Sequence, residues 1–375
     1  MQDPRLDRLA RLMLHHSLKI KRGEAFQITA DMNALPLVKA ILKETKTIGA
    51  LAQVEWTNQE ITRQLLELYD PNDGGATAAF LADKAACGIR RFQNLVGDIV
   101  IRSYVNDQEL NSIDPAIRQM DARAAKPFKD LLNNQRRWVL FEYPTPGQAQ
   151  RAGMAFDSYL DFVLDVSCID YAAMQNNVQP LKDLMQHTDR VRITGPGTDL
   201  RFSIRGIPAV PCCGEYNLPD GECFTAPVKE SAEGFITFNT PTLYWGHTLT
   251  GVRLEFEKGR IARARADQNE AILTKVLDTD PGARYIGEFA IGFNPLVRRP
   301  FCNTLFDEKI TGSFHFTPGA CYTDAPNGND SSIHWDMVAI QRPDYGGGEI
   351  WFDQTLIRKD GLFVLPSLAA LNPPL

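Results

Sequence analysis

Residues 25–56 read AFQITADMNALPLVKAILKETKTIGALAQVEW, and this stretch decides the fold class of the first half of the chain. Residues 25–29 have the composition of a short strand, and residues 51–56 are strand-like again. Between them, residues 34–48 place apolar side chains on one stripe at helical spacing. A strand, a helix and a second strand in this order predict parallel strands joined by a crossover helix.

The same alternation continues toward residue 141. Further segments with helical or strand-like patterns are helices over 59–69, 76–91 and 113–134 and strands over 98–105 and 138–141. We therefore predict an α/β domain with a mainly parallel sheet. No GxGxxG follows an early strand, and no GxxxxGK[ST] occurs, so a nucleotide-phosphate loop is not indicated. The GxG at residues 195–197 separates two strand-like runs and predicts a hairpin turn.

The pattern changes near residue 187, after a polar segment over 169–187 that is typical of a helix. The chain then becomes rich in strand-like runs, which cover 234–239, 252–257, 260–266, 333–340 and 349–357, with one clear helix over 267–279. We therefore expect two domains, an α/β domain over 1–187 and a β-rich α+β domain over 188–375.

Composition limits the classes of partner. The 375 residues carry a formal charge of −6, which weighs against nucleic acid as a partner. No apolar run reaches the ~20 residues of a membrane span, so we expect no membrane association. Seven unpatterned cysteines indicate reduced thiols and a cytoplasmic location. Histidine is scarce, and four of the six fit structural roles: His15, His16, His187 and His247.

The other two histidines indicate a possible metal site. In SIHWDMV, residues 332–338, a strand would place His334 and Asp336 on one face, where a nitrogen and a carboxylate oxygen form half of a divalent-metal site. His315 precedes them by 19 residues among aromatic neighbours. The alternatives are a buried ion pair or an exposed strand face for His334 and Asp336, and a core histidine for His315. Such a trio suits metal-activated water or a non-haem iron oxygenase.

Two glutamates lie in segments with few other charges. Glu222 follows a turn in PDGECFTAP, residues 219–227, and Glu288 interrupts the apolar, glycine-flanked run YIGEFAIG, residues 285–292. A buried carboxylate needs a partner to stay charged. A metal ion is one such partner, and an arginine is the alternative.

At these segments the chain resembles the aminopeptidase T and aminopeptidase S family of metal-dependent exopeptidases. The matching segments follow in family order over about residues 190–340, and they are GECFTAP (221–227), GVRLEF (251–256), LDTDPGAR (277–284), IGE (286–288), NTLFDE (303–308) and IHWD (333–336). The segment after NTLFDE departs from the family pattern, which bears on side-chain preference.

The resemblance implies a β-rich, barrel-like domain that holds two divalent cations, of Zn, Co, Mn or Mg, and an α/β domain that covers the cleft. It places the metal ligands on Glu222, Glu288, His315, His334 and Asp336. It places a catalytic tyrosine on Tyr322, and it implies a peptide substrate, a two-metal-activated water and a homodimer. The expected activity is that of an aminopeptidase.

A related group offers the alternative function. Ring-opening dioxygenases for dihydroxypyridines resemble the same fold and hold one non-haem iron with two histidines and an aspartate. In them, the position of Glu288 is a histidine and that of Glu222 is not acidic. The presence of both glutamates here favours the two-metal peptidases.

Overall fold

The structure is a computed structural model, and it describes residues 3–374. The chain divides into two compact units. The first unit runs to Cys168 and also includes Gly214–Leu218, whereas the second comprises Ile169–Cys213 and the chain from Pro219 onward. Among the described residues, no helix combines the length and the apolar character that crossing a bilayer requires.

The first unit contains a five-stranded sheet in which every neighbouring pair is parallel. Its strands, in spatial order, are β2 (Leu51–Thr57), β1 (Ala25–Asp31), β3 (Gly97–Arg102), β4 (Arg137–Glu142) and β8 (Asn217–Leu218). The predicted parallel α/β sheet is confirmed. The short strand β8 comes from a later part of the chain, and the sequence pattern gave no sign of it.

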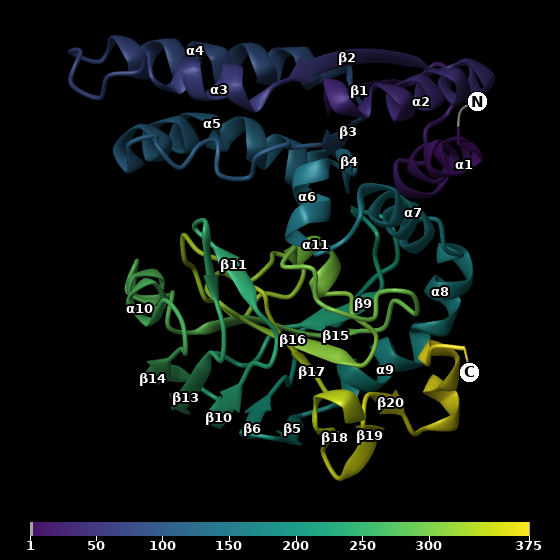
Figure 1. Cartoon of the computed structure of the whole chain (residues 1–375), viewed down its shortest axis with the longest axis vertical. Coiled ribbons are helices and arrows are strands. Elements are labelled where there is room, and N and C mark those ends of the chain that lie inside the picture. Colours follow the sequence, from purple (N-terminus) through teal and green to yellow (C-terminus); the bar gives the residue numbers. More distant parts are fainter. Residues whose placement is uncertain (1–2, 375) are drawn as a thin grey trace. The chain divides into compact units, whose positions relative to one another are not determined.

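Seven α-helices accompany this sheet in the described part of the first unit. They are α1 (Pro4–Arg11), α2 (Leu35–Ile48), α3 (Gln59–Leu66), α4 (Ala76–Arg91), α5 (Pro115–Gln135), α6 (Pro146–Arg151) and α7 (Phe156–Ser167). Helix α2 ends at Gly49, whose φ of 76° suits glycine at a helix terminus. Figure 1 shows α4 and α5 as two long helices of this unit.

The second unit is mainly antiparallel. An eight-stranded sheet has the order β14 (Arg260–Arg265), β13 (Arg253–Glu257), β10 (Glu233–Thr237), β6 (Thr198–Ser203), β5 (Arg190–Gly195), β18 (Glu349–Phe352), β19 (Thr355–Lys359) and β20 (Leu362–Phe363). A five-stranded sheet has the order β17 (Met337–Ile340), β16 (Ser313–Pro318), β15 (Ile286–Gly292), β9 (Glu222–Thr225) and β7 (Val210–Cys212). The hairpin predicted at residues 195–197 joins β5 to β6 and is confirmed.

A two-stranded hairpin and four α-helices complete the described part of this unit, beside short 3-10 helices. They are β11 (Thr242–Tyr244), β12 (His247–Leu249), α8 (Tyr171–Asn177), α9 (Gln179–His187), α10 (Glu270–Leu277) and α11 (Thr304–Asp307). The expectation of one helix over 169–187 is wrong in detail, because α8 ends before Val178 and α9 begins with Pro180 in its first turn. The expected strand over 349–357 is likewise two strands, separated by a turn at Asp353.

Aromatic side chains join the two larger sheets of the second unit. Phe202 on β6 lies 5.0 Å, between ring centroids, from both Phe289 on β15 and Phe316 on β16. Phe256 on β13 lies 5.6 Å from Phe316. Because side chains alternate along a strand, residues next to Phe289 and Phe316 in sequence point to the opposite face of the five-stranded sheet.

The strand expected over 333–340 is wrong in its first half. Strand β17 begins at Met337, and before it only an isolated bridge pairs His334 with Gly319. Backbone hydrogen bonds from Ala320 to Ile333 and from Trp335 to Pro318 hold this part of the chain instead. The predicted reason for His334 and Asp336 to meet, a shared strand face, therefore does not apply.

Candidate metal centre

Strand register places three of the expected ligands on one face of the five-stranded sheet. Glu222 pairs with Gly292, His315 pairs with Ala290, and Glu288 pairs with Thr317. Directly opposed residues share a face, and residues two apart on one strand share it as well. Glu222, Glu288 and His315 therefore lie on the face opposite the aromatic core, and alanine and glycine at the paired positions leave room above the sheet.

Glu288 lies at the middle of the cluster. Its Oε1 is 3.2 Å from His315 Nε2, and its Oε2 is 3.1 Å from His334 Nε2. Glu222 Oε2 lies 3.6 Å from His315 Nε2, and Asp336 Oδ1 lies 3.2 Å from His334 Nε2. The five expected ligands thus form two groups of three, Glu222–Glu288–His315 and Glu288–His334–Asp336, which share Glu288.

Neighbouring groups orient the outer ligands. Thr317 Oγ1 donates a hydrogen bond of 2.8 Å to Asp336 Oδ1. His334 Nδ1 lies 2.8 Å from the carbonyl oxygen of Ala320, which can only accept, so Nδ1 carries the hydrogen. The lone pair of a neutral His334 is then on Nε2, the nitrogen that faces Glu288. This is the arrangement in which a backbone carbonyl prepares a histidine for metal binding.

A lysine that the sequence reasoning missed completes the buried charge cluster. Lys309 is fully buried, and its Nζ lies 2.5 Å from Glu222 Oε1, 2.8 Å from Glu308 Oε1 and 3.4 Å from Asp220 Oδ1. Cys212, Asp220 and Glu222 form a third group of possible ligand atoms, and the Lys309 ammonium supplies the cation at this end. In the sequence, Lys309 is a single lysine directly after NTLFDE. Its position alone does not distinguish a buried lysine from one at the surface.

Negative charge dominates the electrostatics of the cluster. Burial lowers the pKa of His315, but Glu222 and Glu288 outweigh this effect and raise it to about 9. Burial also lowers the pKa of His334, but the negative charges of Asp336 and Glu288 outweigh burial and hold this pKa well above its usual value. Burial also raises the pKa of Glu222. In the absence of metal the two imidazoles therefore hold protons, because the carboxylates require positive charge nearby.

The donor set fits divalent cations. Glu222 Oε2 is buried and makes no hydrogen bond within the described chain, although it faces His315 Nε2 at 3.6 Å. A buried polar atom without a partner is costly, and a metal ion would satisfy it. Three carboxylates and two imidazoles form a mixed oxygen and nitrogen set of the kind that binds Zn, Co or Mn.

Tyr322 lies at the open side of the cluster and remains 49% exposed. Its ring centroid is 4.7 Å from that of His334 and 5.4 Å from that of Phe224. Loss of water around the hydroxyl, together with the charges of Glu288 and Asp336, raises the pKa of Tyr322 well above its usual value. The phenol therefore stays neutral and able to donate a hydrogen bond.

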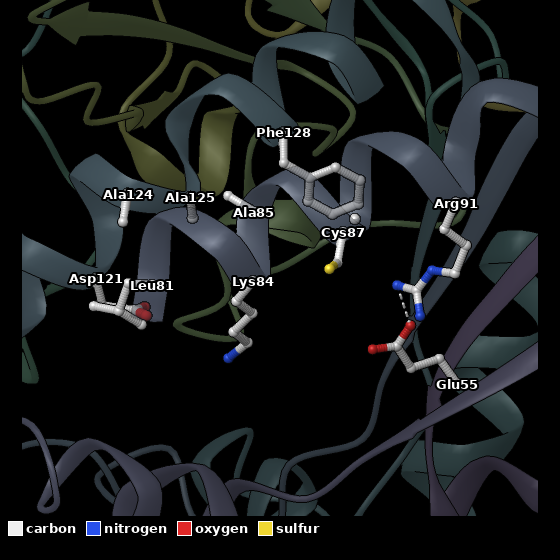
Figure 2. A pocket seen from close by; sticks show the side chains of 11 residues that line it. Glu55, Leu81, Lys84, Ala85, Cys87, Arg91, Asp121, Ala124, Ala125 and Phe128 are labelled. Atoms are coloured by element: carbon white, nitrogen blue, oxygen red, sulfur yellow. Dashed lines mark ion pairs between the residues drawn. The ribbon is translucent and has the colours of Figure 1, made fainter. Parts of the chain in front are cut away.

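The first unit has a hollow of its own, with a volume of about 430 Å³, between α4, α5 and the edge strand β2. Figure 2 shows the ion pair of Arg91 with Glu55 at its rim and Phe128 and Cys87 in its wall. None of the residues that line it belongs to the metal cluster. The hollow is therefore separate from the chemistry described above.

Comparison with known proteins identifies the family. The model of the thermophilic metalloprotease family (M29) matches residues 2–361. The chain belongs to this family. AmpS of Bacillus subtilis, an aminopeptidase, is 36% identical over 85% of this chain and 84% of its own length. Aminopeptidase T of Thermus thermophilus is 26% identical over 91% of this chain and 94% of its own length.

A solved structure supports the fold. Wild-type AmpT from Thermus thermophilus superposes with a TM-score of 0.79 and 23% identity, over 96% of this chain and 99% of that one. The expectation of a metal-dependent aminopeptidase, a hydrolase of the exopeptidase class, is confirmed at the level of the family and of its curated members. The dioxygenase alternative is not favoured.

Proposed function

We propose that this metallo-aminopeptidase works with two divalent cations, held by the five clustered residues, with Glu288 as the ligand common to both. One observation carries the proposal: the two carboxylate oxygens of Glu288 face different histidines, at 3.2 Å from His315 and 3.1 Å from His334. A single-metal site would need only one of the two groups of three. The metals we propose are Zn, Co, Mn or Mg, and the nitrogen ligands favour the first three.

When bound, the cations supply a Lewis acid for the scissile carbonyl and lower the pKa of a water molecule toward neutrality. The chain's own residues do the positioning. Thr317 holds Asp336, and the carbonyl of Ala320 accepts the Nδ1 hydrogen of His334, so that Nε2 faces Glu288 and is the nitrogen that would bind a cation. Tyr322, neutral and half exposed, donates a hydrogen bond to the oxyanion that develops on the substrate.

The family relationship supports exopeptidase behaviour, because the curated relatives that the chain resembles over most of its length are aminopeptidases. We therefore propose peptides with a free amino terminus as substrates.

We further propose that the protein is a cytoplasmic homodimer. All seven cysteines lie in the described chain and are free thiols, which suits a reducing compartment. In the first unit, α5 has no buried side chain, and Phe80 and Ile61 are 60% and 54% exposed. Such an apolar surface is typical of a subunit interface. Light scattering should give twice the chain mass, and F80E should lower it toward the monomer value.

The decisive experiment combines metal counting with an activity panel. The purified protein, dialysed against Zn²⁺, Co²⁺ or Mn²⁺, should hold two ions per chain by elemental analysis and release p-nitroaniline from aminoacyl-p-nitroanilides. A chelator should abolish the release. Oxygen consumption with Fe²⁺ and a dihydroxypyridine, at one iron per chain, would instead support the dioxygenase function and contradict the proposal.

A further inference from the structure

Trp245 lies at the tip of the β11–β12 hairpin in a backbone conformation that tryptophan rarely adopts. Its φ is 47°, that of Gly246 is 76°, and the flanking pair is Tyr244 with His247. A two-residue loop with both φ angles positive is a type I′ turn, which favours Asn-Gly or Asp-Gly. A bulky residue at positive φ is strained, and this one is also 51% exposed.

The same unit contains two turns that show what this geometry ordinarily takes. Lys258–Gly259 has φ values of 49° and 77°, and Asp360–Gly361 has values of 48° and 80°. Both turns place a polar, solvent-compatible residue at the first position. Neither the turn geometry nor solubility therefore explains a tryptophan at position 245. A strained backbone at an exposed residue indicates a functional role.

The hairpin is fixed directly to the segment that carries two of the ligands. The ring of Tyr244 stacks on that of Trp335, with centroids 4.5 Å apart and an angle of 21° between planes. Trp335 Nε1 donates a hydrogen bond of 2.9 Å to Thr242 Oγ1.

Trp335 separates His334 from Asp336 in the sequence, so the hairpin packs on the chain between two ligands. Trp335 is 1% exposed and anchors the hairpin, whereas Trp245, next to Tyr244, keeps half of its surface open. Tyr322, also half exposed, lies against His334, and the ring of Trp245 lies 6.0 Å from that of Tyr244, between centroids. Open aromatic surface is therefore present on the hairpin that packs against the ligand-bearing segment.

We infer that Trp245 forms the wall of a subsite for the amino-terminal side chain of the peptide, and that this subsite takes large apolar or aromatic side chains. The inference rests on the proposed function, because in an aminopeptidase substrate that side chain belongs to the residue that carries the scissile carbonyl. An indole face offers apolar area and stacking to phenylalanine or leucine but little to alanine. The strained turn keeps the indole at the surface, on the hairpin that packs against the segment between His334 and Asp336.

Two variants separate this role from a structural one. W245G and W245N both suit a type I′ turn, so their melting temperatures should stay equal to that of wild type or rise by about 1–3 °C. Their kcat/KM should fall about tenfold for L-phenylalanyl- and L-leucyl-p-nitroanilide, the size expected for a lost aromatic contact, and stay within about twofold for the L-alanyl substrate. K258G, which changes the equivalent position of another turn, should leave all three unchanged.

A phenylalanine-to-alanine preference that is the same in wild type and both variants would overturn the subsite, as would an equal loss on all substrates. Calorimetric titration tests it without turnover: wild-type protein should bind free L-phenylalanine more tightly than L-alanine, and W245G should lose the difference. Absence of that difference in wild type also overturns the subsite. A wild-type protein that shows the difference but hydrolyses none of the three substrates would contradict the proposed function instead.

Discussion

Lys309 Nζ lies 2.5 Å from Glu222 Oε1, and both side chains are shut off from solvent. This contact fixes one carboxylate oxygen of Glu222 and leaves the other, Oε2, to face His315 at 3.6 Å. A buried ammonium between carboxylates is stable only while its partners remain charged. Lys309 therefore acts on the metal centre through Glu222, as a positioning residue.

Replacing Lys309 with methionine should strongly destabilise the second unit. K309M leaves Glu222, Glu308 and Asp220 buried without their common cation, and removal of one partner from a buried pair typically costs about 3–5 kcal/mol. Urea unfolding of the metal-free protein measures this. The control is K43M: Lys43 is 72% exposed and pairs with Asp7, so its loss should cost under about 1 kcal/mol. Equal midpoints for the two variants would contradict the role of Lys309.

Metal counts should distinguish the shared ligand from the outer ones. E222Q and D336N each remove a carboxylate from one group of three, so each should retain about one ion per chain. E288Q removes the carboxylate common to both groups and should lose both ions and all turnover while remaining folded. E255Q, on the partly exposed strand β13, provides the control and should keep both ions. Full metal content in E288Q would refute the assignment of Glu288.

The hydroxyl of Tyr322 should matter for turnover and for nothing else. Y322F keeps the ring against His334 and Phe224, so its melting temperature and metal content should equal those of wild type. Loss of one oxyanion donor typically lowers kcat by about 10²–10³-fold. Steady-state kinetics measure this, with Y345F as a control that removes a hydroxyl elsewhere in the unit. A wild-type kcat in Y322F would exclude Tyr322 as the oxyanion donor.

Part of the cluster is visible in the sequence as a carboxylate in an unusual setting. The run over 285–292 is apolar apart from Glu288, and in the folded strand β15 Glu288 lies on the face opposite Phe289 and the aromatic core. The segment before Met337 is not the expected strand, because its backbone hydrogen bonds join it to Pro318, at the end of β16, and to Ala320 in the loop that follows. Such loop pairing leaves no periodic trace in the sequence.

Lys309 illustrates what sequence reasoning could not reach. Its importance depends on carboxylates at positions 220, 222 and 308, which only the folded sheet brings around one ammonium. A lone lysine in a sequence predicts a solvated side chain, since lysine is seldom fully buried. The short strand β8 was missed for a related reason, because two residues carry no periodicity and their parallel partner β4 lies far away in the chain.

The metal-free protein should lose stability as the pH rises from about 6.5 to about 9. Burial lowers the pKa of His315, but Glu222 and Glu288 raise it overall from 6.5 to about 9 in the folded chain. A proton bound more tightly in the folded state stabilises it fully below the unfolded pKa, and this contribution disappears above the folded one. The shift at His334 has the same sign. Melting temperatures of chelator-treated protein should therefore fall across this window. Zn²⁺-loaded protein should not show the fall, because metal binding requires the unprotonated imidazoles and gains from high pH. A metal-free melting temperature that rises with pH would contradict the buried cluster.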